Sequence, residues 1–356
     1  MRAMILAAGR GERLMPITDL LPKPALGVLG IPLVVHALHW LRRHGVERAV
    51  MNLHHRPQTL AEQLVPHLGE LTPEMHYSFE AKLLGSGGGL ANARHFFENE
   101  TTVVVANSDA IHDIDLTAAL EAHAGSDDAA TLVCLPRREG YGAVELDEAG
   151  KILSLSGAPE VDAGRVARTV TFSGIHLIDA RELAGLRAAE PWNLRDLYRT
   201  WAADGRIGSY PHEGFWWEFG DPASFLEGCL RILALEEDER RALVHTDPVL
   251  VQDGTRVARS PGAGVDDSAE LCGRVALGFA TRVSRACRVE DSVLLSESWI
   301  GPGTSLRRVL VAPHTEIPAG KTFEDCILMR DTGNHDYHRA GLERRDGILI
   351  RSFESA

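Results

Sequence analysis

The last third of the chain carries a six-residue repeat, and this repeat restricts the fold more than any other feature. Aliphatic residues recur at every sixth position, and a second series of mostly small or apolar residues lies four positions after them along the chain. Neither an α-helix nor the two-residue alternation of a strand produces this period. It is typical of a solenoid in which each side is one hexapeptide and the aliphatic side chain points inward. With two single-residue deletions, the first series is Val265, Leu271, Leu277, Val283, Val289, Leu295, Ile300, Leu306, Ala312, Ile317 and Phe323.

This period resembles that of the left-handed parallel β-helix, in which three hexapeptides form one coil. The eleven positions then correspond to fewer than four coils. We therefore expect a short left-handed β-helix of hexapeptide repeats over residues 249–330. A C-terminal tail, residues 331–356, follows it, and its sequence, including residues 334–338, shows no readable pattern. A meander of short strands is the alternative interpretation of the repeat.

The first two thirds of the chain alternate strand-like and helix-like segments. Such alternation predicts an α/β domain with a mixed, mostly parallel sheet over residues 1–243. Ligands of such sheets bind beyond the carboxyl ends of the strands, and both Gly9 and Asp109 directly follow predicted strands. The expected strands are 4–8, 49–53, 102–106 and 130–135, the expected helices are 33–44, 60–68, 90–97, 116–124 and 221–242, and the expected linker is 245–248.

Composition argues against several classes of protein. The formal net charge of −13 argues against a broad nucleic-acid-binding surface. The five cysteines lack a C-x-x-C spacing, which argues against a zinc site or a disulfide framework and is typical of a reducing compartment. No signal peptide precedes the first strand, and no apolar run reaches the roughly 20 residues of a membrane span. We expect a cytoplasmic protein with no nucleic-acid or membrane partner.

The first predicted strand runs into a glycine-rich turn. Gly9 and Gly11 lack a Cβ, so their backbone N–H groups can approach an anion closely. Arg13 and Lys23 add two positive charges that suit phosphate oxygens. Leu14 stands where a dinucleotide fingerprint requires its third glycine, and the segment also lacks a Walker A loop. The turn therefore indicates a triphosphate site, with a strand-to-helix turn bearing solvated cations as the alternative.

The same segment resembles the signature of the sugar-1-phosphate nucleotidyltransferases, or nucleotide-sugar pyrophosphorylases. The pattern G-x-G-[TE]-R-L-x-P-[LI]-T, followed by P-K-P, is matched at residues 9–18 and 22–24. The resemblance covers about the first 235 residues and implies a Rossmann-like catalytic domain. It implies that Arg13 and Lys23 are catalytic. The nucleotide-binding residues that it implies at this segment are Leu6, Ala7, Ala8, Gly9, Gly11, Arg13 and Lys23.

A second glycine segment, residues 84–90, resembles the L-G-[ST]-[AG]-G loop of this family. The resemblance implies that Gly85, Ser86 and Gly87 contact the base and ribose. Glycines allow the backbone to approach a flat ring closely. A flexible linker is the alternative interpretation.

Two acidic motifs resemble the metal site of the family. Asn107-Ser108-Asp109 matches N-[GS]-D, which implies a nucleotide contact for Asn107 and a Mg²⁺ ligand for Asp109, where a turn or helix-cap role is the alternative. Residues 216–222, Trp-Trp-Glu-Phe-Gly-Asp-Pro, resemble the family pattern W-x-D-[IV]-G-[TQ]-P, with Glu218 at the position of the aspartate. We favour Glu218 as the second Mg²⁺ ligand over Asp221, because Glu is a competent oxygen ligand at the matching position.

The sugar side shows a departure from the family pattern. Tyr141-Gly142 and Ser173-Gly174 resemble sugar-contacting segments, which implies sugar-phosphate contacts for Gly142, Ser173 and Gly174. The family usually has E-K-P about fifteen residues after the first motif, and its lysine binds the sugar phosphate. Residues 157–159 are Gly-Ala-Pro, so that lysine is absent. We expect Arg165 or Arg168 to replace it.

The resemblance implies the transfer of a nucleotidyl group from an NTP to a sugar 1-phosphate, which gives an NDP-sugar and pyrophosphate with Mg²⁺ as cofactor. The layout is most similar to that of mannose-1-phosphate guanylyltransferases, which implies GTP. Uridylyl- or thymidylyltransfer to another sugar phosphate is one alternative. A non-catalytic nucleotide-sugar-binding paralogue and an added acyltransferase activity are others. A solenoid face invites association, so we also expect a homo-oligomer.

Overall fold

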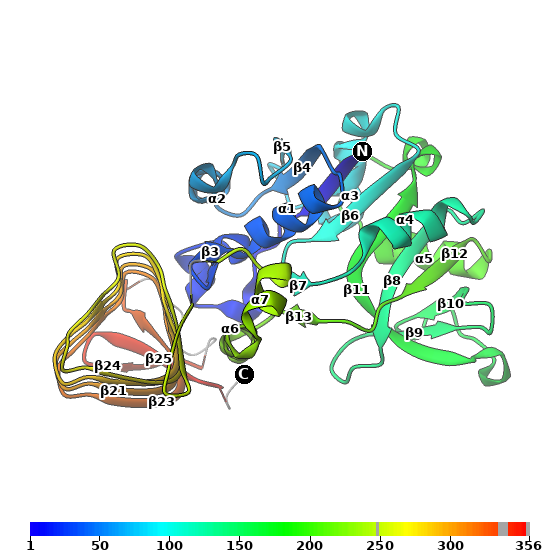
Figure 1. The fold of residues 1–356 in the computed structure, drawn as a ribbon. Coiled ribbons are helices and arrows are strands. Elements are labelled where there is room, and N and C mark those ends of the chain that lie inside the picture. The colour runs from blue at the N-terminus through cyan, green and yellow to red at the C-terminus, as the bar shows by residue number, and fades with distance from the viewer. Residues whose placement is uncertain (247–248, 334–340, 354–356) are drawn as a thin grey trace. The chain divides into compact units, whose positions relative to one another are not determined.

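The structure, a computed structural model, describes residues 1–246, 249–333 and 341–353. The chain folds into two compact units. The first, which we call the sheet unit, consists of Met1–Gly9, Ala37–Gln58 and Val65–Trp216. The second consists of Arg10–His36, Thr59–Leu64 and Trp217–Ala356. We call it the ladder unit, because stacked parallel strands form much of it (Figure 1).

A mixed nine-stranded sheet forms the core of the sheet unit. Its main path is β10-β9-β11-β6-β1-β4-β5, and β8 pairs with both β11 and β12. The strands β5, β4, β1 and β6 run parallel, whereas β11 is antiparallel to β6, β8 and β9. The α/β prediction with a mixed sheet is confirmed. The strands are β1 (Arg2–Leu6), β4 (Arg48–Leu53), β5 (Glu74–Phe79), β6 (Thr102–Asn107), β8 (Ala130–Pro136), β9 (Ala143–Leu146), β10 (Ile152–Leu155), β11 (Arg168–Asp179) and β12 (Ile207–Pro211).

The central strands of this sheet are buried on both faces. Residues 103–105 of β6 and residues 3–5 of β1 have no exposed surface. Strands covered on both faces consist of continuous apolar residues, which makes them easy to predict. β1 nevertheless ends at Leu6, so residues 7 and 8 belong to the loop that follows it and not to the predicted strand. This loop is where the glycine turn begins.

Four helices of the first two thirds of the chain overlap predicted segments, whereas the helix at residues 194–203 was not predicted. They are α1 (Leu33–Arg43), α2 (Pro57–Leu64), α3 (Gly85–Asn92), α4 (Leu116–Ala124) and α5 (Leu194–Ala203). The helix predicted at 90–97 begins instead at Gly85 and gives way to a 3₁₀ turn, Arg94–Phe97. Four glycines in its first turns disfavour a helix by propensity, so tertiary packing must stabilise it. Among the described residues, no helix has the length and apolarity needed to cross a membrane.

Parallel strands stack into two ladders in the ladder unit. One has the order β16-β18-β20-β22 and the other β14-β15-β17-β19-β21-β23-β25-β24. In the parallel part, Val265 pairs with Val283 and Val289 with Leu306, steps of 18 and 17 residues. Three six-residue sides per turn would produce such a step. The left-handed β-helix itself stays a prediction. The strands are β14 (Val249–Gln252), β15 (Thr255–Arg259), β16 (Gly264–Val265), β17 (Glu270–Leu277), β18 (Arg282–Val283), β19 (Arg288–Leu294), β20 (Trp299–Ile300), β21 (Ser305–Val311), β22 (Glu316–Ile317) and β23 (Thr322–Arg330).

One column of the ladder differs from the predicted series. Leu277 pairs with Leu294, and Leu294 pairs with Val311, whereas the six-residue count predicts Leu295 and Ala312. The register between β17 and β19 shifts by one residue before this column, so the deletion falls earlier than predicted. All five side chains are buried, and hydrophobicity alone therefore does not locate the deletion.

The segment between sheet and ladder forms two helices where one, 221–242, was expected. They are α6 (Pro222–Ala234) and α7 (Glu237–Leu243). α6 contacts β15, β17, β19 and β21, so these helices group with the ladder. The predicted domain limits at 243, 249 and 330 stay predictions. The guanidinium of Arg256 in β15 donates to the Leu235 carbonyl at 2.6 Å, where a cation suits a helix C-terminus.

The predicted tail contains two strands, β24 (Glu343–Arg345) and β25 (Ile348–Ser352). β25 pairs antiparallel with β23 and with β24, so it continues the larger ladder. Residues 247–248 of the predicted linker and residues 334–340 and 354–356 of the tail lie outside the described residues. The remaining short strands are β2 (Gly27–Val28), β3 (Ile31–Pro32), β7 (Ala110–His112) and β13 (Trp216–Glu218).

Candidate active site

Two side chains of the sheet unit fix the carboxyl end of β1. The Ser108 hydroxyl donates to the Leu6 carbonyl at 2.8 Å, and the Ala7 backbone N–H donates to Asn52 Oδ1 at 2.8 Å. The Ala7 N–H group therefore already has a protein acceptor. None of the described atoms lies within 4 Å of a Cβ built on Gly9, so the backbone there is open for a close approach.

A buried polar network connects the two glycine segments. Asn52 Nδ2 donates to Glu80 Oε1 at 2.7 Å, and the Leu84 N–H donates to Glu80 Oε2 at 2.9 Å. Asn52 and Glu80 are only 3% and 5% exposed, so a missing partner would be costly. The sequence motifs gave no prediction for either residue. A polar side chain near the end of the apolar strand β4 was the signal that could have revealed Asn52.

The glycines of the second segment face other parts of the protein. A Cβ on Gly87 would lie 2.2 Å from the Trp192 ring, and one on Gly88 would lie 2.3 Å from the Glu190 carbonyl. The Ser86 hydroxyl accepts from the Leu194 N–H at 2.9 Å. The linker alternative is wrong, because residues 85–92 form α3. Close packing explains these glycines, and the contacts predicted for Gly85, Ser86 and Gly87 with a nucleotide stay predictions.

A break in pairing along β11 brings several predicted residues together. β8 pairs with both halves of β11, so β9 and β6 share its other edge, with β9 up to Thr171 and β6 from Ile175. Gly174 lies in this interval with φ 91, and a Cβ there would lie 2.7 Å from Asn107 Nδ2. Asp109 follows β6 two residues later and is partly buried. The end of β6 and the middle of β11 thus form one local site.

Trp216 completes this part of the sheet unit. Its indole Nε1–H donates to the Ser173 carbonyl at 2.9 Å, and its ring lies 5.4 Å from that of Tyr141. Ser173 itself is buried, and its hydroxyl accepts from the Ile175 N–H at 3.2 Å. A Cβ on Gly142 would lie 2.4 Å from Ser156 Oγ. We call this set, Asn107, Asp109, Tyr141, Gly142, Ser173, Gly174 and Trp216, the β11 notch.

A buried histidine lies on β11 just beyond the notch. Burial lowers the pKa of His176 to about 3, and its Nδ1 lies 2.6 Å from the Tyr198 hydroxyl. His112 of β7 shows the same effect, because burial lowers its pKa to about 3. Both imidazoles are therefore neutral at neutral pH, and they have structural rather than charge-bearing roles.

In the ladder unit the rest of the signature folds around Gly11. Gly11 has φ 64, and a Cβ there would lie 2.9 Å from Thr18 Cγ2 and 3.1 Å from Lys23 Cβ. The Thr18 hydroxyl donates to the Gly11 carbonyl at 3.1 Å. Only glycine fits both this conformation and this space. Lys23 is 8% exposed and starts a 3₁₀ turn, Lys23–Ala25.

Arg13 and Glu218 form an ion pair within the ladder unit. Arg13 Nη2 lies 2.6 Å from Glu218 Oε1, and the two side chains are 67% and 16% exposed. A Cβ on Gly220 would lie 3.1 Å from Arg13 Nη1 and 2.9 Å from the same carboxylate oxygen. Gly220 therefore leaves room for the pair. The arrangement anchors the guanidinium while keeping most of it accessible to an anion.

Asp221 has a different role in the structure. Its carboxylate accepts from the Ser224 N–H at 2.8 Å, and the Ser224 hydroxyl interacts with the Asp221 backbone, which forms a capping box at the start of α6. Helix capping accounts for this acid fully. The choice of Glu218 over Asp221 as a metal ligand stays a prediction.

The C-terminal strand of the ladder unit contacts the signature. Arg351 of β25 donates from Nη1 to the Met15 carbonyl at 2.7 Å and to the Arg13 carbonyl at 3.4 Å. A Cβ on Gly30 would lie 2.0 Å from Ser260 Oγ, so the β2–β3 turn also packs on a ladder segment. No sequence pattern links positions 13 and 351, so sequence motifs could not predict the role of Arg351.

The two arginines expected to replace the missing lysine are both exposed. Arg168 begins β11 and pairs with Leu146 of β9, and its Nη2 is 4.0 Å from a Cβ built on Gly150. Five residues of strand separate it from Ser173, about 16 Å at about 3.3 Å per residue. Arg165 lies in an exposed 3₁₀ turn before it. That Arg165 or Arg168 replaces the lysine stays a prediction.

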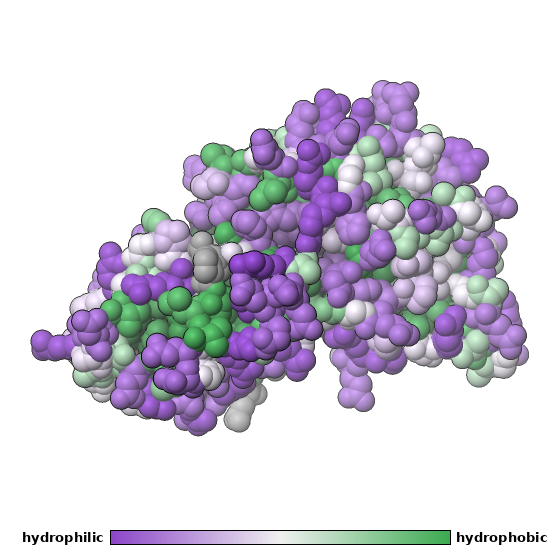
Figure 2. Space-filling view, in the orientation of Figure 1, coloured by the Kyte–Doolittle hydropathy of each residue, from purple (hydrophilic) through white to green (hydrophobic). Residues whose placement is uncertain are grey.

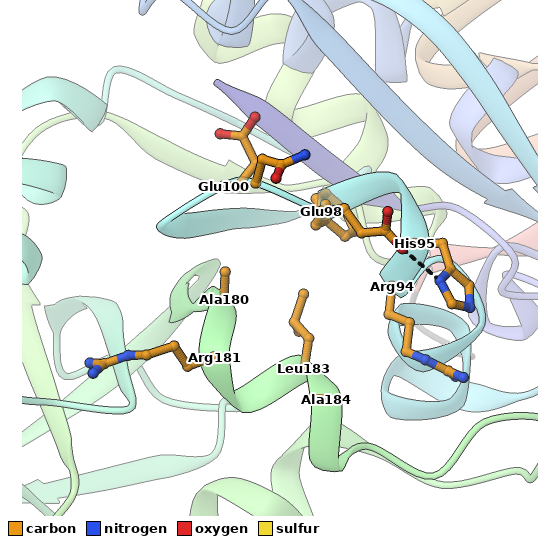
Figure 3. A pocket seen from close by; sticks show the side chains of 10 residues that line it. Arg94, His95, Glu98, Glu100, Ala180, Arg181, Leu183 and Ala184 are labelled. Atoms are coloured by element: carbon orange, nitrogen blue, oxygen red, sulfur yellow. Dashed lines mark hydrogen bonds and ion pairs between the residues drawn. The ribbon is translucent and has the colours of Figure 1, made fainter.

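A cavity of about 360 Å³ lies elsewhere in the sheet unit (Figure 3). It is lined by the turn that precedes β6 and by the one that follows β11, so it lies at the opposite end of these strands from the notch. Figure 3 shows Glu98 and His95 turned toward each other across 3.0 Å. None of the residues predicted for the active site lines it.

The carboxylates of the two acidic motifs suit magnesium by donor type. In the described part of the chain, His, Cys, Asp and Glu form no cluster of three that could hold a metal. Mg²⁺ in nucleotide sites usually takes one or two carboxylates and completes its octahedron with water and phosphate oxygens. Asp109 and Glu218 each offer a carboxylate of this kind, and their role as Mg²⁺ ligands stays a prediction.

Comparison with known families identifies the chain. A model described as nucleotidyl transferase matches residues 2–234. The chain belongs to this family. The resemblance of its signature to the sugar-1-phosphate nucleotidyltransferases is thereby confirmed.

Several relatives match this nucleotidyl transferase. The UTP–glucose-1-phosphate uridylyltransferase of Synechocystis sp. is 28% identical over 352 residues, 87% of each chain. The catalytic subunit beta of mannose-1-phosphate guanylyltransferase from Dictyostelium discoideum is 31% identical over 232 residues, 64% of this chain and 63% of its own. The mannose-1-phosphate guanylyltransferase of Mycobacterium tuberculosis is 26% identical over 313 residues, 86% and 83% of the two chains.

A solved structure supports the same fold. HddC from Yersinia pseudotuberculosis superimposes with a TM-score of 0.54 at 19% identity, covering 65% of this chain and 98% of its own. At this identity the likeness concerns the fold alone.

Proposed function

We propose that this protein transfers a nucleotidyl group from an NTP to a sugar 1-phosphate, with release of pyrophosphate. The observation that carries the proposal is the folded signature, in which Gly11, Lys23 and an accessible Arg13 gather in one segment. The family match and the names of the relatives support the same reaction. Gly9 and Gly11 can approach polyphosphate oxygens closely, and the two cations can neutralise them.

The chemistry requires charge neutralisation more than proton transfer. A sugar phosphate is already an anionic nucleophile, so no general base is needed. The barrier comes from repulsion between this anion and the polyphosphate, and positioning with electrostatic stabilisation lowers it. Arg13 and Lys23 hold the triphosphate and stabilise the leaving pyrophosphate. Glu218 orients the Arg13 guanidinium through their 2.6 Å contact.

We propose Mg²⁺ as the cofactor, with Asp109 and Glu218 as its protein ligands. Bound magnesium supplies additional neutralisation of phosphate charge. The assignment rests on the two motifs in which these acids occur and on the preference of Mg²⁺ for carboxylate oxygen. The remaining predicted contacts with the nucleotide and the sugar complete the proposal.

We also propose which NTP and which sugar 1-phosphate the protein uses. The layout and several relatives favour GTP and mannose 1-phosphate. The uridylyltransferase from Synechocystis sp. makes UTP with glucose 1-phosphate the specific alternative. A non-catalytic nucleotide-sugar-binding protein is the second candidate function, favoured by the absence of the sugar-phosphate lysine at residues 157–159.

A substrate panel tests the proposal. We expect pyrophosphate release when GTP and mannose 1-phosphate are both present with Mg²⁺, less release with UTP and glucose 1-phosphate, and none after EDTA addition. Omission of either substrate provides the control. If the protein binds nucleotide sugars but releases no pyrophosphate in any combination, the non-catalytic function is correct.

We further propose that the ladder is a left-handed β-helix and that it mediates a homo-oligomer. The ladder unit carries four large apolar side chains that are between 44% and 62% exposed: Leu250, Val251, Phe279 and Trp299. Figure 2 shows apolar surface over the ladder strands. Sedimentation at several concentrations tests the assembly, and a monomer throughout would contradict it.

A further inference from the structure

The missing lysine leaves the sugar-phosphate site without its expected cation. Residues 157–159 supply none, Arg165 lies in an exposed turn, and Arg168 lies five residue steps along β11 from Ser173. A dianionic phosphate bound next to a second anion still needs a positive partner. A cation next to the Ser173–Gly174 segment would supply this partner.

Three contacts place Arg138 beside the β11 notch. It follows β8, and its backbone N–H donates to the Thr171 hydroxyl at 3.0 Å, where the edge of β11 changes partners. Its Nη1 donates to the Trp216 carbonyl at 3.3 Å. Its guanidinium carbon lies 5.2 Å from the centre of the Trp216 ring, a cation–π distance.

Trp216 connects this guanidinium to the sugar-side motifs. The same indole donates to the Ser173 carbonyl and lies against Tyr141. Arg138 and the two motifs that resemble sugar-contacting segments therefore share one aromatic side chain. The sequence offered no signal for this, because residue 138 precedes the Tyr-Gly motif and lies far in sequence from position 216.

The charge of Arg138 is available for a ligand. Among the described residues, no carboxylate lies within ion-pair distance of it, and the side chain is half-buried. The bond to the Trp216 carbonyl occupies one of its N–H donors, which leaves the remainder of the planar fork for phosphate oxygens. Arg137, in contrast, donates to the Tyr141 carbonyl at 2.8 Å and to Thr171 Oγ1 at 3.3 Å, so its guanidinium holds the loop itself.

We propose that Arg138 binds the phosphate of the sugar 1-phosphate in place of the absent lysine. The inference rests on the proposed function, whose site it completes. Arginine recognises phosphate through a fork, whereas lysine provides a point charge, so the exchange changes the geometry of recognition. The ring and the carbonyl of Trp216 hold the guanidinium in place.

The test compares Arg138→Ala with a matched control. Arg206 also lies over a tryptophan, 5.9 Å from the Trp201 ring, but at the start of β12, and it pairs with Glu182. We expect Arg138→Ala to raise the KM for sugar 1-phosphate about 10- to 100-fold, the worth of one charged hydrogen-bonding group, with the KM for NTP unchanged. Arg138→Lys should recover part of the loss. Arg206→Ala should leave both constants unchanged.

The outcomes separate this inference from the proposed function. If wild-type protein releases no pyrophosphate with any substrate pair, the proposed function fails. If the wild type is active and folded Arg138→Ala retains its KM for sugar 1-phosphate, only the present inference fails. A rise in that KM for Arg165→Ala or Arg168→Ala, without one for Arg138→Ala, would return the role to those residues. A melting temperature within about 2 °C of wild type confirms folding of each variant.

Discussion

The two units hold their parts of the signature by opposite means. In the sheet unit, Asn52 and Glu80 fix the start of the glycine turn through buried hydrogen bonds. In the ladder unit, Arg13 is fixed by an ion pair and by Arg351, and its side chain is 67% exposed. Buried hydrogen bonds resist salt, whereas exposed charge pairs are screened and weak.

In the proposed site, the backbone conformation and the position of the cation are therefore fixed by different kinds of contact. The backbone that must approach the polyphosphate is positioned by groups that water cannot reach. The cation that must change partners when a ligand binds is positioned by groups that water reaches easily. Rigid glycine turns and exchangeable cations are both needed where a highly charged substrate enters and leaves.

The largest expected contrast between the units is in acid. His112 and His176 belong to the sheet unit, and their folded pKa of about 3 lies below the ordinary value of roughly 6.5. The unfolded state therefore binds more protons below pH 6.5, so stability is lost as pH falls from about 6.5 to about 3. At pH 4.5 we expect a loss of roughly 2 to 3 kcal/mol for each histidine.

Hydrogen exchange localises this effect. Amides of β6 and β11 should lose protection between pH 6.5 and pH 4.5, after correction for intrinsic rates, while amides of β19 and β21 change less. His176→Gln should reduce the acid loss measured by urea unfolding. His314→Gln is the control, because His314 is half exposed and pairs with Glu297 in the ladder. Equal acid sensitivity of both units would refute the contrast.

The next largest effect is expected at Asp109, which follows β6. Asp109→Ala should reduce kcat at least ~10²-fold, comparable to removal of one key electrostatic group. Titration of Mg²⁺ should then require higher concentrations for half-maximal rate. Asp113→Ala, four residues later and paired with His212, serves as the control with near-normal kcat. Near-normal turnover by folded Asp109→Ala would remove this residue from the magnesium site.

A smaller effect is expected at the contact between the C-terminal strand and the signature. Arg351→Ala removes a charged donor from the Met15 carbonyl and should lower kcat/KM for NTP about tenfold. Hydrogen exchange of residues 13–19 should accelerate. Arg345→Ala on the adjacent strand β24, where the arginine lies over Phe323, should alter neither. Unchanged exchange in Arg351→Ala would show that the ladder does not position the loop.

The smallest expected effect distinguishes the role of Asp221 from that of Glu218. Asp221→Ala removes the cap of α6 and should cost about 1 kcal/mol of stability with kcat retained. Glu218→Ala should instead lower kcat with little change in stability. Urea unfolding and steady-state kinetics of both variants measure these quantities. The reverse pattern would make Asp221 the metal ligand.

Local patterns predicted much of the fold. Apolar runs identify β1, β4, β6 and β8, because these strands are buried on both faces. The six-residue series anticipates the spacing of the ladder strands, but it misplaces Leu294 and Val311 by one residue, since their buried neighbours are equally apolar. Helix α3 was predicted too late, because its glycines oppose helix formation and only packing against Trp192 explains them.

The candidate site was predictable only where residues are close in sequence. Gly11, Arg13 and Lys23 lie within thirteen positions of one another, and the structure folds them together. Asn52, Arg138 and Arg351 act through partners that lie between 28 and 338 residues away, so no local spacing reveals them. Arg165 and Arg168 were predicted from closeness in sequence, and their role stays a prediction.

Isotope tracing tests the central claim most directly. The protein is incubated with Mg²⁺, mannose 1-phosphate and GTP labelled at its α-phosphate. The account predicts that the label enters a sugar-linked diphosphate in an amount equal to the unlabelled pyrophosphate released, and only when the sugar phosphate is present. Label that stays in GTP, or that appears as GMP without any sugar phosphate, would contradict nucleotidyl transfer.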